Sequence, residues 1–323
     1  MRKRASSAMR PLGSLVNGRV YSIGIFAGPS PLALAPVAEA ANPVLTRDSV
    51  ADVLTTFVAD PFMIRVEGTW YLFFEAMVWR PGMRKGEIAC ATSQDGLRWA
   101  FRRSVLAEPF HLSYPYVFRQ GSDFYMVPES TGAGAVRLYR ADPFPDRWVL
   151  VKELLRGPVL LDSSLFEHEG RWWMLTAPSL RGDTLRLFHA PLLTGPWTEH
   201  PASPVVHGDA RIARPAGRVL MTPGGPLRFA QDCRSSYGVS VQAVRITRLT
   251  PTEYEESEVP GNPVLSGSGH GWNQLGMHHV DAHQLEDGTW LACVDGWSSR
   301  VRRPRELFRW AADRLGRPGG RTP

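Results

Sequence analysis

A phrase of 17 residues occurs three times in this 323-residue chain, and its recurrence restricts the fold more than any other feature. Each copy starts with a polar or aromatic residue, continues with an apolar run and a glycine-containing turn, and reaches an aromatic pair ten residues after its start. Apolar runs on both sides of a tight turn predict a β-hairpin in every copy. The copies are DPFMIRVEGTWYLFFEA (60–76), YPYVFRQGSDFYMVPES (114–130) and DSSLFEHEGRWWMLTAP (162–178).

Two weaker copies extend the pattern, because Asp209 lies ten residues before Val219 and Val280 lies ten residues before Trp290. Repeat units of roughly 50 residues are typical of propeller blades. A single hairpin cannot bury both of its faces, so successive units must pack against one another around a channel. The sequence therefore predicts an all-β fold, a five-bladed β-propeller.

Strand-like segments between the hairpins supply the outer strands of each predicted blade, and three of them close near Trp99, Trp148 and Trp197. We expect these tryptophans to pack between blades. The segment VYSIGIF, around Ile23, is expected to close the ring by joining the last blade. The predicted blade cores are 58–100, 112–149, 160–198, 207–249 and 278–297. The predicted division of the chain is a poorly ordered or disordered tail (1–19), the propeller (20–300) and a basic appendage (301–323) with a helix over 304–315.

The net charge of +6 does not indicate nucleic-acid binding, because much of the excess lies at the two ends of the chain. No apolar run reaches the length of a membrane-spanning helix, so no transmembrane segment is expected. The apolar stretch after MRKR is interrupted by polar residues, glycine and proline, unlike a secretory signal. Three widely spaced cysteines weakly favour a reducing compartment. We therefore expect a cytoplasmic location, with secretion the less favoured alternative.

Fingerprints of common cofactors and nucleophiles are missing from the sequence, which has no GxSxG, Walker, dinucleotide or HExxH motif. No cofactor is expected. The segment HHVDAH (278–283) could suggest a metal site, but alternate residues of a strand face opposite ways. At most His279, Asp281 and His283 share a face, so a structural or substrate-binding histidine is favoured over a metal ligand, and no metal is expected.

Carboxylates recur at two places in the repeat. The innermost strand of a blade lines the channel, so the first residues of the repeats, Asp60, Tyr114, Asp162 and more weakly Asp209, should converge at one mouth. The residue five positions after the first aromatic is also acidic in three repeats, at Glu75, Glu129 and Asp295. A buried acid is costly unless it is paired or functional. These acids can therefore either tie blades together or perform chemistry.

A cluster of acids in a funnel suits glycosidic bond chemistry, in which one carboxylic acid protonates the departing oxygen and one carboxylate activates water or attacks the sugar. Burial and mutual repulsion can separate the two pKa values. Aromatic residues near the same openings would suit stacking against sugar rings, and these are Tyr114, Tyr116, Trp79 and Trp272. The candidate catalytic residues are Asp60, Glu129 and Asp162. The candidate substrate-binding residues are Glu75, Tyr114, Tyr116, Arg228, Asp232, His279 and Asp281.

Several segments resemble the five-bladed domain at the N-terminus of plant glucosamine inositolphosphorylceramide transferases, and similar domains occur in bacterial proteins. The resemblance runs from about Tyr21 to Trp297. It is carried by VADPFMIRVEGTWYLFFEA, SYPYVFRQGSDFYMVPES, VRLYRADPFPDRW, LDSSLFEHEGRWWMLTA and LRFAQDCRSSYGVSVQAVRITRLTP. The last of these segments contains Arg228 and Asp232.

More distantly, the chain resembles the propeller glycosidases that include arabinanases, xylosidases and invertases. The resemblance implies that an Asp of the first blade acts as base or nucleophile, a second Asp tunes pKa and a Glu of the third blade is the acid. Asp60 matches the first role by position. The second blade instead starts with Tyr114 and carries Glu129, and the third blade offers Asp162 in place of Glu. Two functions stay open: a glycoside hydrolase or transglycosylase, and a non-catalytic module, each with a glycan or glycoconjugate partner.

Overall fold

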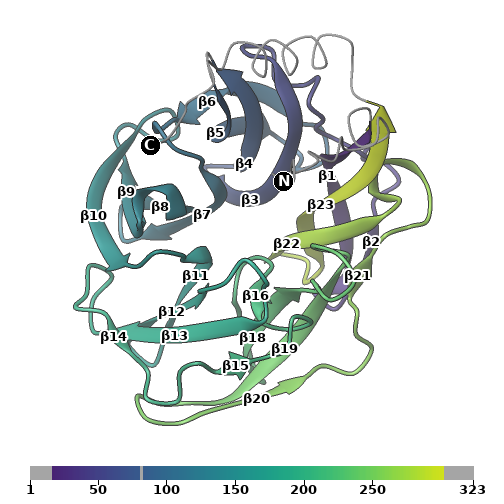
Figure 1. The fold of residues 1–323 in the computed structure, drawn as a ribbon. Helices are drawn as coiled ribbons and strands as arrows, with labels where there is room; N and C mark the ends of the chain where they lie inside the picture. Colours follow the sequence, from purple (N-terminus) through teal and green to yellow (C-terminus); the bar gives the residue numbers. More distant parts are fainter. Residues whose placement is uncertain (1–16, 81–82, 302–323) are drawn as a thin grey trace, which may run out of the picture.

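Five antiparallel sheets form a ring in the computed structural model, which describes residues 17–80 and 83–301 (Figure 1). Within these residues the only helical segments are the short 3-10 turns η1 (Thr131–Ala133) and η2 (Gly271–Asn273). The prediction of an all-β, five-bladed propeller is confirmed. None of the helices in the described part of the chain is long and apolar enough to cross a membrane.

Blades 1 to 3 each run outward from the channel in chain order. Blade 1 contains β3 (Thr55–Val66), β4 (Thr69–Arg80), β5 (Met83–Ser93) and β6 (Ala100–Leu106). Blade 2 contains β7 (Ser113–Gln120), β8 (Asp123–Glu129), β9 (Ala135–Ala141) and β10 (Trp148–Arg156). Blade 3 contains β11 (Leu161–His168), β12 (Arg171–Ala177), β13 (Thr184–Ala190) and β14 (Thr198–Glu199), with β15 (Val206–His207) beside β13.

Blades 4 and 5 depart from this simple order. Blade 4 contains β16 (Arg214–Pro215), β17 (Leu220–Thr222), β18 (Gly225–Gln231), β19 (Ser240–Leu249), β20 (Tyr254–Glu258) and β21 (Leu265–Ser266). Blade 5 joins the two ends of the described chain, because β22 (Gly276–Gln284) and β23 (Trp290–Val301) continue into β1 (Asn17–Ser30) and β2 (Ala33–Pro36).

Ring closure depends on the long antiparallel pairing of β1 with β23, in which Ile23 lies opposite Asp295. The prediction that the strand around Ile23 closes the ring is confirmed. Strand β1 already begins at Asn17, inside the segment expected to be a poorly ordered tail. Residues 1–16, the appendage beyond Val301 and the helix expected over 304–315 lie outside the described residues.

The repeated hairpins owe their shape to the turn that the sequence places between their strands. In blades 1 and 3 the two turn residues are Glu67-Gly68 and Glu169-Gly170, and all four have φ between 48° and 82°. Two successive positive φ values define the type I′ turn, whose twist matches that of the flanking strands. The glycine is favoured at the second position because it carries no Cβ.

Tryptophans pack the blades against one another, as predicted. Trp148 is buried, and its ring meets that of Phe73 of blade 1 edge-on with centroids 5.4 Å apart. Trp99 packs against the apolar core shared by blades 1 and 5, and Trp197 against the core shared by blades 1 to 3. Complete burial of one large apolar side chain contributes about 1.5–3 kcal/mol, so these contacts are a substantial part of blade-to-blade adhesion.

Candidate functional site

Three repeat-starting residues share an unusual backbone conformation. Asp60, Tyr114 and Asp162 have φ values of 52°, 47° and 50°. Each lies where the innermost strand of its blade bulges and its pairing with the next strand changes register. A left-handed conformation costs a non-glycine residue roughly 1–3 kcal/mol, so the surrounding structure must hold it in place.

Carboxylates of neighbouring blades hold two of these bulges. The backbone N–H of Asp60 donates to the Asp295 carboxylate of blade 5 over 2.9 Å. The backbone N–H of Tyr114 in turn donates to the Asp60 carboxylate over 3.3 Å. The acid of one blade therefore accepts the bulged N–H of the next. This arrangement ties the blades together and places the acids at one mouth of the channel.

His278 joins these acids from blade 5. Its Nδ1 lies 2.6 Å from an Asp295 oxygen, and its Nε2 lies 3.5 Å from an Asp60 oxygen. All three residues are buried, with Asp60 6 % exposed, His278 2 % and Asp295 0 %. An ionised carboxylate can only accept, so Nδ1 carries the proton of the short hydrogen bond to Asp295.

The pKa values of Asp60, His278 and Asp295 are all shifted from their usual values. Burial raises the pKa of Asp60 to about 7, with His278 opposing and Asp295 and Asp162 adding to the rise. Burial alone would lower the pKa of His278, but the Asp295 carboxylate raises it above its usual value. Burial acts against ionisation of Asp295 too, yet His278 holds the pKa of Asp295 below its usual range. An ionised His278–Asp295 pair therefore lies beside a carboxyl that exchanges its proton near neutral pH.

Asp162 faces the same mouth but has its charge compensated. Arg214 Nε donates to one Asp162 oxygen over 2.5 Å, and the Gln231 amide donates to the same oxygen over 3.0 Å. Both partners belong to blade 4, at the start of β16 and the end of β18. Asp162 is 2 % exposed, so this pair is a buried salt bridge between blades 3 and 4.

The two glutamates of the repeat differ in how well they are satisfied. Glu129 accepts hydrogen bonds at both oxygens, from the Ser113 hydroxyl (3.2 Å) and from the Thr131 N–H (2.7 Å). Glu75 is 5 % exposed, and its Oε1 has no hydrogen-bond partner. Burial raises the pKa of Glu75 well above its usual value, and the charges of Asp60 and Glu129 raise it further. Both effects favour the protonated form of the Glu75 carboxyl.

Glu75 lies next to Asp60 because Ala59 and Glu75 are opposite each other in the β3–β4 ladder. His111 Nε2 is 3.7 Å from the unpartnered Glu75 oxygen. Burial lowers the pKa of His111, which favours the neutral ring beside this acid. We call the six residues Asp60, Glu75, Glu129, Asp162, His278 and Asp295 the mouth cluster.

Tyr114 and Tyr116 are not exposed stacking platforms, which corrects the expectation for both rings. They are 0 % and 3 % exposed. The Tyr114 hydroxyl bonds Ser164 Oγ (2.8 Å) and accepts from the Gly217 N–H (2.7 Å), and the Tyr116 hydroxyl donates to the Leu165 carbonyl. Both phenols thus join blade 2 to its neighbours inside the channel.

The other two aromatic candidates also differ from the expectation of exposed rings. Trp272 is half-buried and packs against the core of blades 4 and 5, whereas Trp79 is 8 % exposed and lines a cavity beside the mouth cluster.

His279 and Asp281 both lie within the channel, but His279 packs between aromatic rings whereas Asp281 is paired with a cation. His279 is completely buried between the rings of Phe62 and Tyr114, and neither of its nitrogens has a hydrogen-bond partner. Burial lowers the pKa of His279 to about 4, so the ring is neutral. Asp281 accepts from Arg218 Nε over 2.7 Å, and although burial opposes its ionisation, this guanidinium holds the pKa of Asp281 below its usual range.

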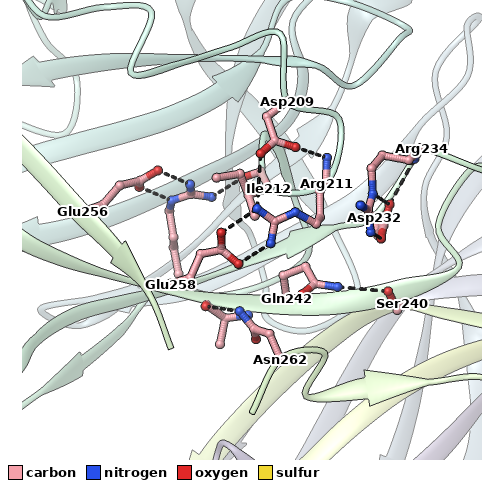
Figure 2. A network of polar contacts seen from close by, with 12 residues as sticks. Asp209, Arg211, Ile212, Asp232, Arg234, Ser240, Gln242, Glu256, Glu258 and Asn262 are labelled. Carbon is pink, nitrogen blue, oxygen red and sulfur yellow. Dashed lines mark hydrogen bonds and ion pairs between the residues drawn. The ribbon is translucent and has the colours of Figure 1, made fainter. Parts of the chain in front are cut away.

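The remaining candidate site residues lie in or just before blade 4, and not all of them belong near the mouth cluster. Figure 2 shows Asp209 beside Arg211, which also pairs with Glu258, and Asp232 beside Arg234. Arg228 donates two hydrogen bonds of 2.7 and 2.6 Å to Glu256 of the outer strand β20, so its guanidinium points to that strand. Asp232 directly follows Gln231, the partner of Asp162, but its own carboxylate pairs with Arg234.

Asp209 does not start an innermost strand, contrary to expectation, because it precedes β16 by five residues and its side chain is 37 % exposed. In blade 5 the register change lies between Gly276 and His279, before Val280. The spacing of ten fails there because residues 285–289 form a longer hairpin loop than the two-residue turns of blades 1 and 3.

One group of described residues has the composition of a metal site. Asp60, His278 and Asp295 each offer a ligand atom, and these atoms lie within 4.8 Å of one another. The short His278–Asp295 hydrogen bond already uses Nδ1, and Nε2 faces Asp60. A metal ion between them would replace the protons that now link these groups.

Comparison with known proteins places the fold and the mouth cluster in context. The family model described as "Glucosamine inositolphosphorylceramide transferase 1, N-terminal" matches residues 16–297. The chain belongs to this family. Glucosamine inositolphosphorylceramide transferase 1 of Oryza sativa subsp. japonica is 36 % identical over 312 residues, covering 89 % of the chain and 41 % of that relative. The Arabidopsis thaliana protein of the same name is 35 % identical over 298 residues, covering 85 % and 39 %.

The chain therefore spans about two fifths of the length of these family members. Both are plant proteins, so these two relatives lend no support to a bacterial type of protein, which the resemblance to domains of bacterial proteins also suggested. Solved structures share the fold at low identity. β-1,2-Mannobiose phosphorylase from Listeria innocua has a TM-score of 0.60 at 15 % identity, covering 88 % of the chain and 98 % of that structure. A thermostable family-43 glycoside hydrolase has a TM-score of 0.54 at 16 % identity, covering 76 % and 93 %.

For this member of the transferase N-terminal family, the sequence identified most acids of the mouth cluster but missed two of their partners. The sequence does not single out His278, because the ten-residue spacing points to Val280, although the His278-His279 pair is a signal of polar groups in the last blade. Arg214 was missed because nothing in the local sequence links it to Asp162, which lies 52 residues earlier.

Proposed function

We propose that the channel mouth is a carbohydrate site in which Asp60 and Glu75 act as the acid–base pair for hydrolysis or transfer of a glycosidic bond. The observation that carries this proposal is the burial of two carboxyl groups side by side on adjacent strands of one blade, both with a raised pKa. Asp60 has a pKa raised by burial to about 7, and Glu75 has a pKa raised well above its usual value. General catalysis requires two such groups, one able to donate and one able to accept a proton.

Glu75 suits the role of general acid. Glu75 is buried, burial raises its pKa well above the usual value, and one of its oxygens has no hydrogen-bond partner inside the protein. This group can therefore meet a ligand oxygen without breaking an existing hydrogen bond. A general acid must approach the departing glycosidic oxygen closely, and protonation of that oxygen promotes bond cleavage.

Asp60 suits the role of general base. A base is most effective when its pKa lies near the working pH, because it is then sufficiently ionised and still basic enough to take a proton. His278 and Asp295 are positioning residues in this scheme. They hold Asp60 by one backbone hydrogen bond and one charged contact, and their charges help to set its proton affinity.

Membership in the transferase family and a fold shared with glycoside hydrolases and a phosphorylase support a carbohydrate ligand. The relatives are named glucosamine inositolphosphorylceramide transferases, so their name joins an amino sugar with an inositol phospholipid. A glycoconjugate is therefore the class of ligand that we propose for this propeller.

The charge compensation of Asp162 favours a second function, glycan binding without turnover. Arg214 and Gln231 occupy its carboxylate, and both Glu129 oxygens are satisfied, so neither acid is set up to exchange protons with a ligand. In this alternative the mouth cluster would serve as a hydrogen-bonding surface for sugar hydroxyls.

Leaving-group dependence tests the proposal. We expect wild type to hydrolyse members of a panel of alkyl and dinitrophenyl glycosides. Glu75→Gln should lower the rate on alkyl glycosides by about 10²–10⁴-fold, because their leaving oxygen needs a proton. The same variant should be much less impaired on dinitrophenyl glycosides, whose leaving group departs unprotonated. Glu167→Gln, at an exposed position of β11, is the matched control.

If the rate of Glu75→Gln fell equally on alkyl and dinitrophenyl glycosides, Glu75 would not be the general acid. Glycan binding without turnover of any panel member would support the second function instead.

A further inference from the structure

The short segment that joins blade 1 to blade 2 carries hydrogen-bond donors for the mouth cluster. At its end, the backbone N–H of Tyr114 donates to Asp60 over 3.3 Å, and the Ser113 hydroxyl donates to Glu129 over 3.2 Å. His111 belongs to the same segment, between β6 and β7. Its side chain faces the third acid that blades 1 and 2 contribute to the mouth cluster.

That third acid is Glu75, and it meets His111 beside Gly86. His111 Nε2 lies 3.7 Å from Glu75 Oε1, the buried oxygen that has no hydrogen-bond partner. A Cβ at residue 86 would lie 2.8 Å from His111 Cε1, 2.9 Å from Glu75 Oε1 and 2.1 Å from the Leu112 carbonyl oxygen. Because glycine carries no Cβ, the imidazole and the carboxyl can approach each other at this point of β5.

The backbone of Gly86 also determines which nitrogen of His111 carries a proton. The Gly86 N–H donates to His111 Nδ1 over 2.8 Å. A backbone N–H can only donate, so Nδ1 accepts and is unprotonated. The neutral ring then has its proton on Nε2, the nitrogen that faces Glu75. His111 is therefore a hydrogen-bond donor toward this acid.

We propose that His111 is a positioning residue for Glu75, whose Oε1 accepts a hydrogen bond from His111 Nε2–H when the carboxyl gives up its proton. The separation of 3.7 Å exceeds the usual N–H···O distance of about 2.7–3.2 Å by less than about 1 Å, so a small side-chain rotation closes it. The His111 side chain is 40 % exposed, so packing does not hold its ring on every side. A hydrogen bond to an ionised acceptor is roughly twice as strong as a neutral one, so the contact strengthens as Glu75 becomes charged.

Each proton has a defined place in this step. The proton of Glu75 goes to the departing glycosidic oxygen, and the glycosidic bond breaks with its electron pair on that oxygen. His111 keeps its own proton on Nε2, and no proton passes through the ring, because Nδ1 accepts from the Gly86 N–H. The catalytic meaning of the contact rests on the proposed role of Glu75 as general acid, whereas the hydrogen bond itself does not depend on turnover.

Charged groups of several strands act on one or both members of the pair. Burial is the largest cause of each shift, and it raises the pKa of Glu75 and lowers the pKa of His111. The carboxylates among these groups raise the pKa values and the guanidinium lowers them; the groups are Asp60 (β3), Arg84 (β5), Glu129 (β8), Asp162 (β11) and Asp295 (β23). All of them are kept in a variant at position 111, so a changed pKa of Glu75 reports the lost donor.

NMR titration of the Glu75 carboxyl carbon and the His111 ring nitrogens in the full chain tests the inference without any substrate. We expect wild-type His111 to be neutral near neutral pH with its proton on Nε2, and the Nε2 resonance to shift as Glu75 ionises. This shift should be absent in Glu75→Gln. His111→Phe keeps an aromatic ring and removes the donor, so it should raise the pKa of Glu75 by about one to two units. His111→Gln places an amide N–H near the position of Nε2 and should restore most of the wild-type pKa.

His168→Phe is the matched control. His168 Nε2 also lies near a glutamate oxygen, 3.9 Å from Glu169, but at the opposite end of β11 from the mouth cluster. This variant should leave the pKa of Glu75 unchanged. A proton on Nδ1 of wild-type His111, or equal pKa values of Glu75 in wild type and His111→Phe, would overturn the inference. If His111→Phe did not fold, the Nε2 titration of wild type against Glu75→Gln would decide the question.

Turnover separates this inference from the proposed function. On alkyl glycosides, His111→Phe should lower kcat by about tenfold, because a charge-assisted hydrogen bond of the transition state is lost. The alkaline limb of its pH profile should move to higher pH, since Glu75 keeps its proton longer. If wild type turned over no glycoside while His111→Phe still raised the pKa of Glu75, only the proposed function would fail. If Glu75→Gln behaved as loss of the general acid while His111→Phe changed neither the pKa nor the pH profile, only this inference would fail.

Discussion

His278 donates a 2.6 Å hydrogen bond from Nδ1 to the Asp295 carboxylate, inside a propeller channel where both side chains are buried. This pair joins neighbouring residues of the β22–β23 ladder and fixes which nitrogen of the imidazole faces Asp60. The other nitrogen, Nε2, is 3.5 Å from that carboxyl. Proton exchange at Asp60 is therefore coupled to a charged pair that the fold itself positions.

The raised pKa of Asp60 predicts a pH dependence of stability. Its folded-state pKa of about 7 lies above the usual value of 3.8, so the folded state binds more protons than the unfolded state between these values. Asp60 therefore contributes stability that is fully present below about pH 4 and is lost as pH rises through 7. A shift of about three pKa units corresponds to up to roughly 4 kcal/mol.

Urea unfolding of wild type and Asp60→Asn from pH 4.5 to 7.5 measures this contribution. As pH rises, the free energy of unfolding of Asp60→Asn should increase relative to that of the wild type. The opposing contribution of His279 is present in both chains and largely cancels in the difference. The difference therefore reports Asp60 together with the His278–Asp295 pair that is coupled to it. A difference that does not change with pH would show that Asp60 has an ordinary pKa.

Tyr114→Phe should lower the free energy of unfolding by about 1–3 kcal/mol, because the buried Gly217 N–H loses its acceptor. The hydroxyl also bonds Ser164, so its loss weakens the contact of blade 2 with blades 3 and 4 together. Urea denaturation measures the effect, with Tyr125→Phe, on a half-buried tyrosine of β8, as the control. If both variants matched wild type, the Tyr114 hydroxyl would have no part in holding the blades.

Arg218→Met should cost about 3–5 kcal/mol, because it removes the guanidinium that compensates the buried Asp281 carboxylate and leaves only the Met63 N–H and His283 beside it. The double variant Arg218→Met/Asp281→Asn should recover part of that loss, since the uncompensated charge is gone. A double-mutant cycle by urea denaturation gives the coupling between the two residues. Additive losses would mean that the two side chains do not interact in solution.

The repeat pattern predicts the fold because each hairpin and its turn are determined locally. It also predicts that Asp60, Tyr114 and Asp162 occupy equivalent positions, and the structure gives all three the same bulged backbone. Their hydrogen-bond partners could not be predicted, because these come from other blades. Asp295 bonds a residue 235 positions away, and Arg214 reaches Asp162 across a blade boundary.

Burial of the aromatic candidates could not be predicted from the sequence either. Tyr114 and Tyr116 are compatible with a ligand-stacking surface by residue type, and only the cross-channel partners of their hydroxyls show that they fill the channel. The role proposed for Glu75 likewise depends on its Oε1, which is buried without a hydrogen-bond partner. No sequence pattern reveals this.

Turnover of a glycoside by Asp60→Asn tests the central claim most directly, with Asp209→Asn as the matched control because that aspartate is exposed in the loop before blade 4. We expect the rate of Asp60→Asn on a substrate of the wild type to fall by about 10²–10⁴-fold, as for loss of a general base, while Asp209→Asn keeps the wild-type rate. Glycan affinity should change much less, because the amide keeps most hydrogen bonds. Full activity of Asp60→Asn would contradict the assignment of Asp60 as the proton-transfer group at the channel mouth.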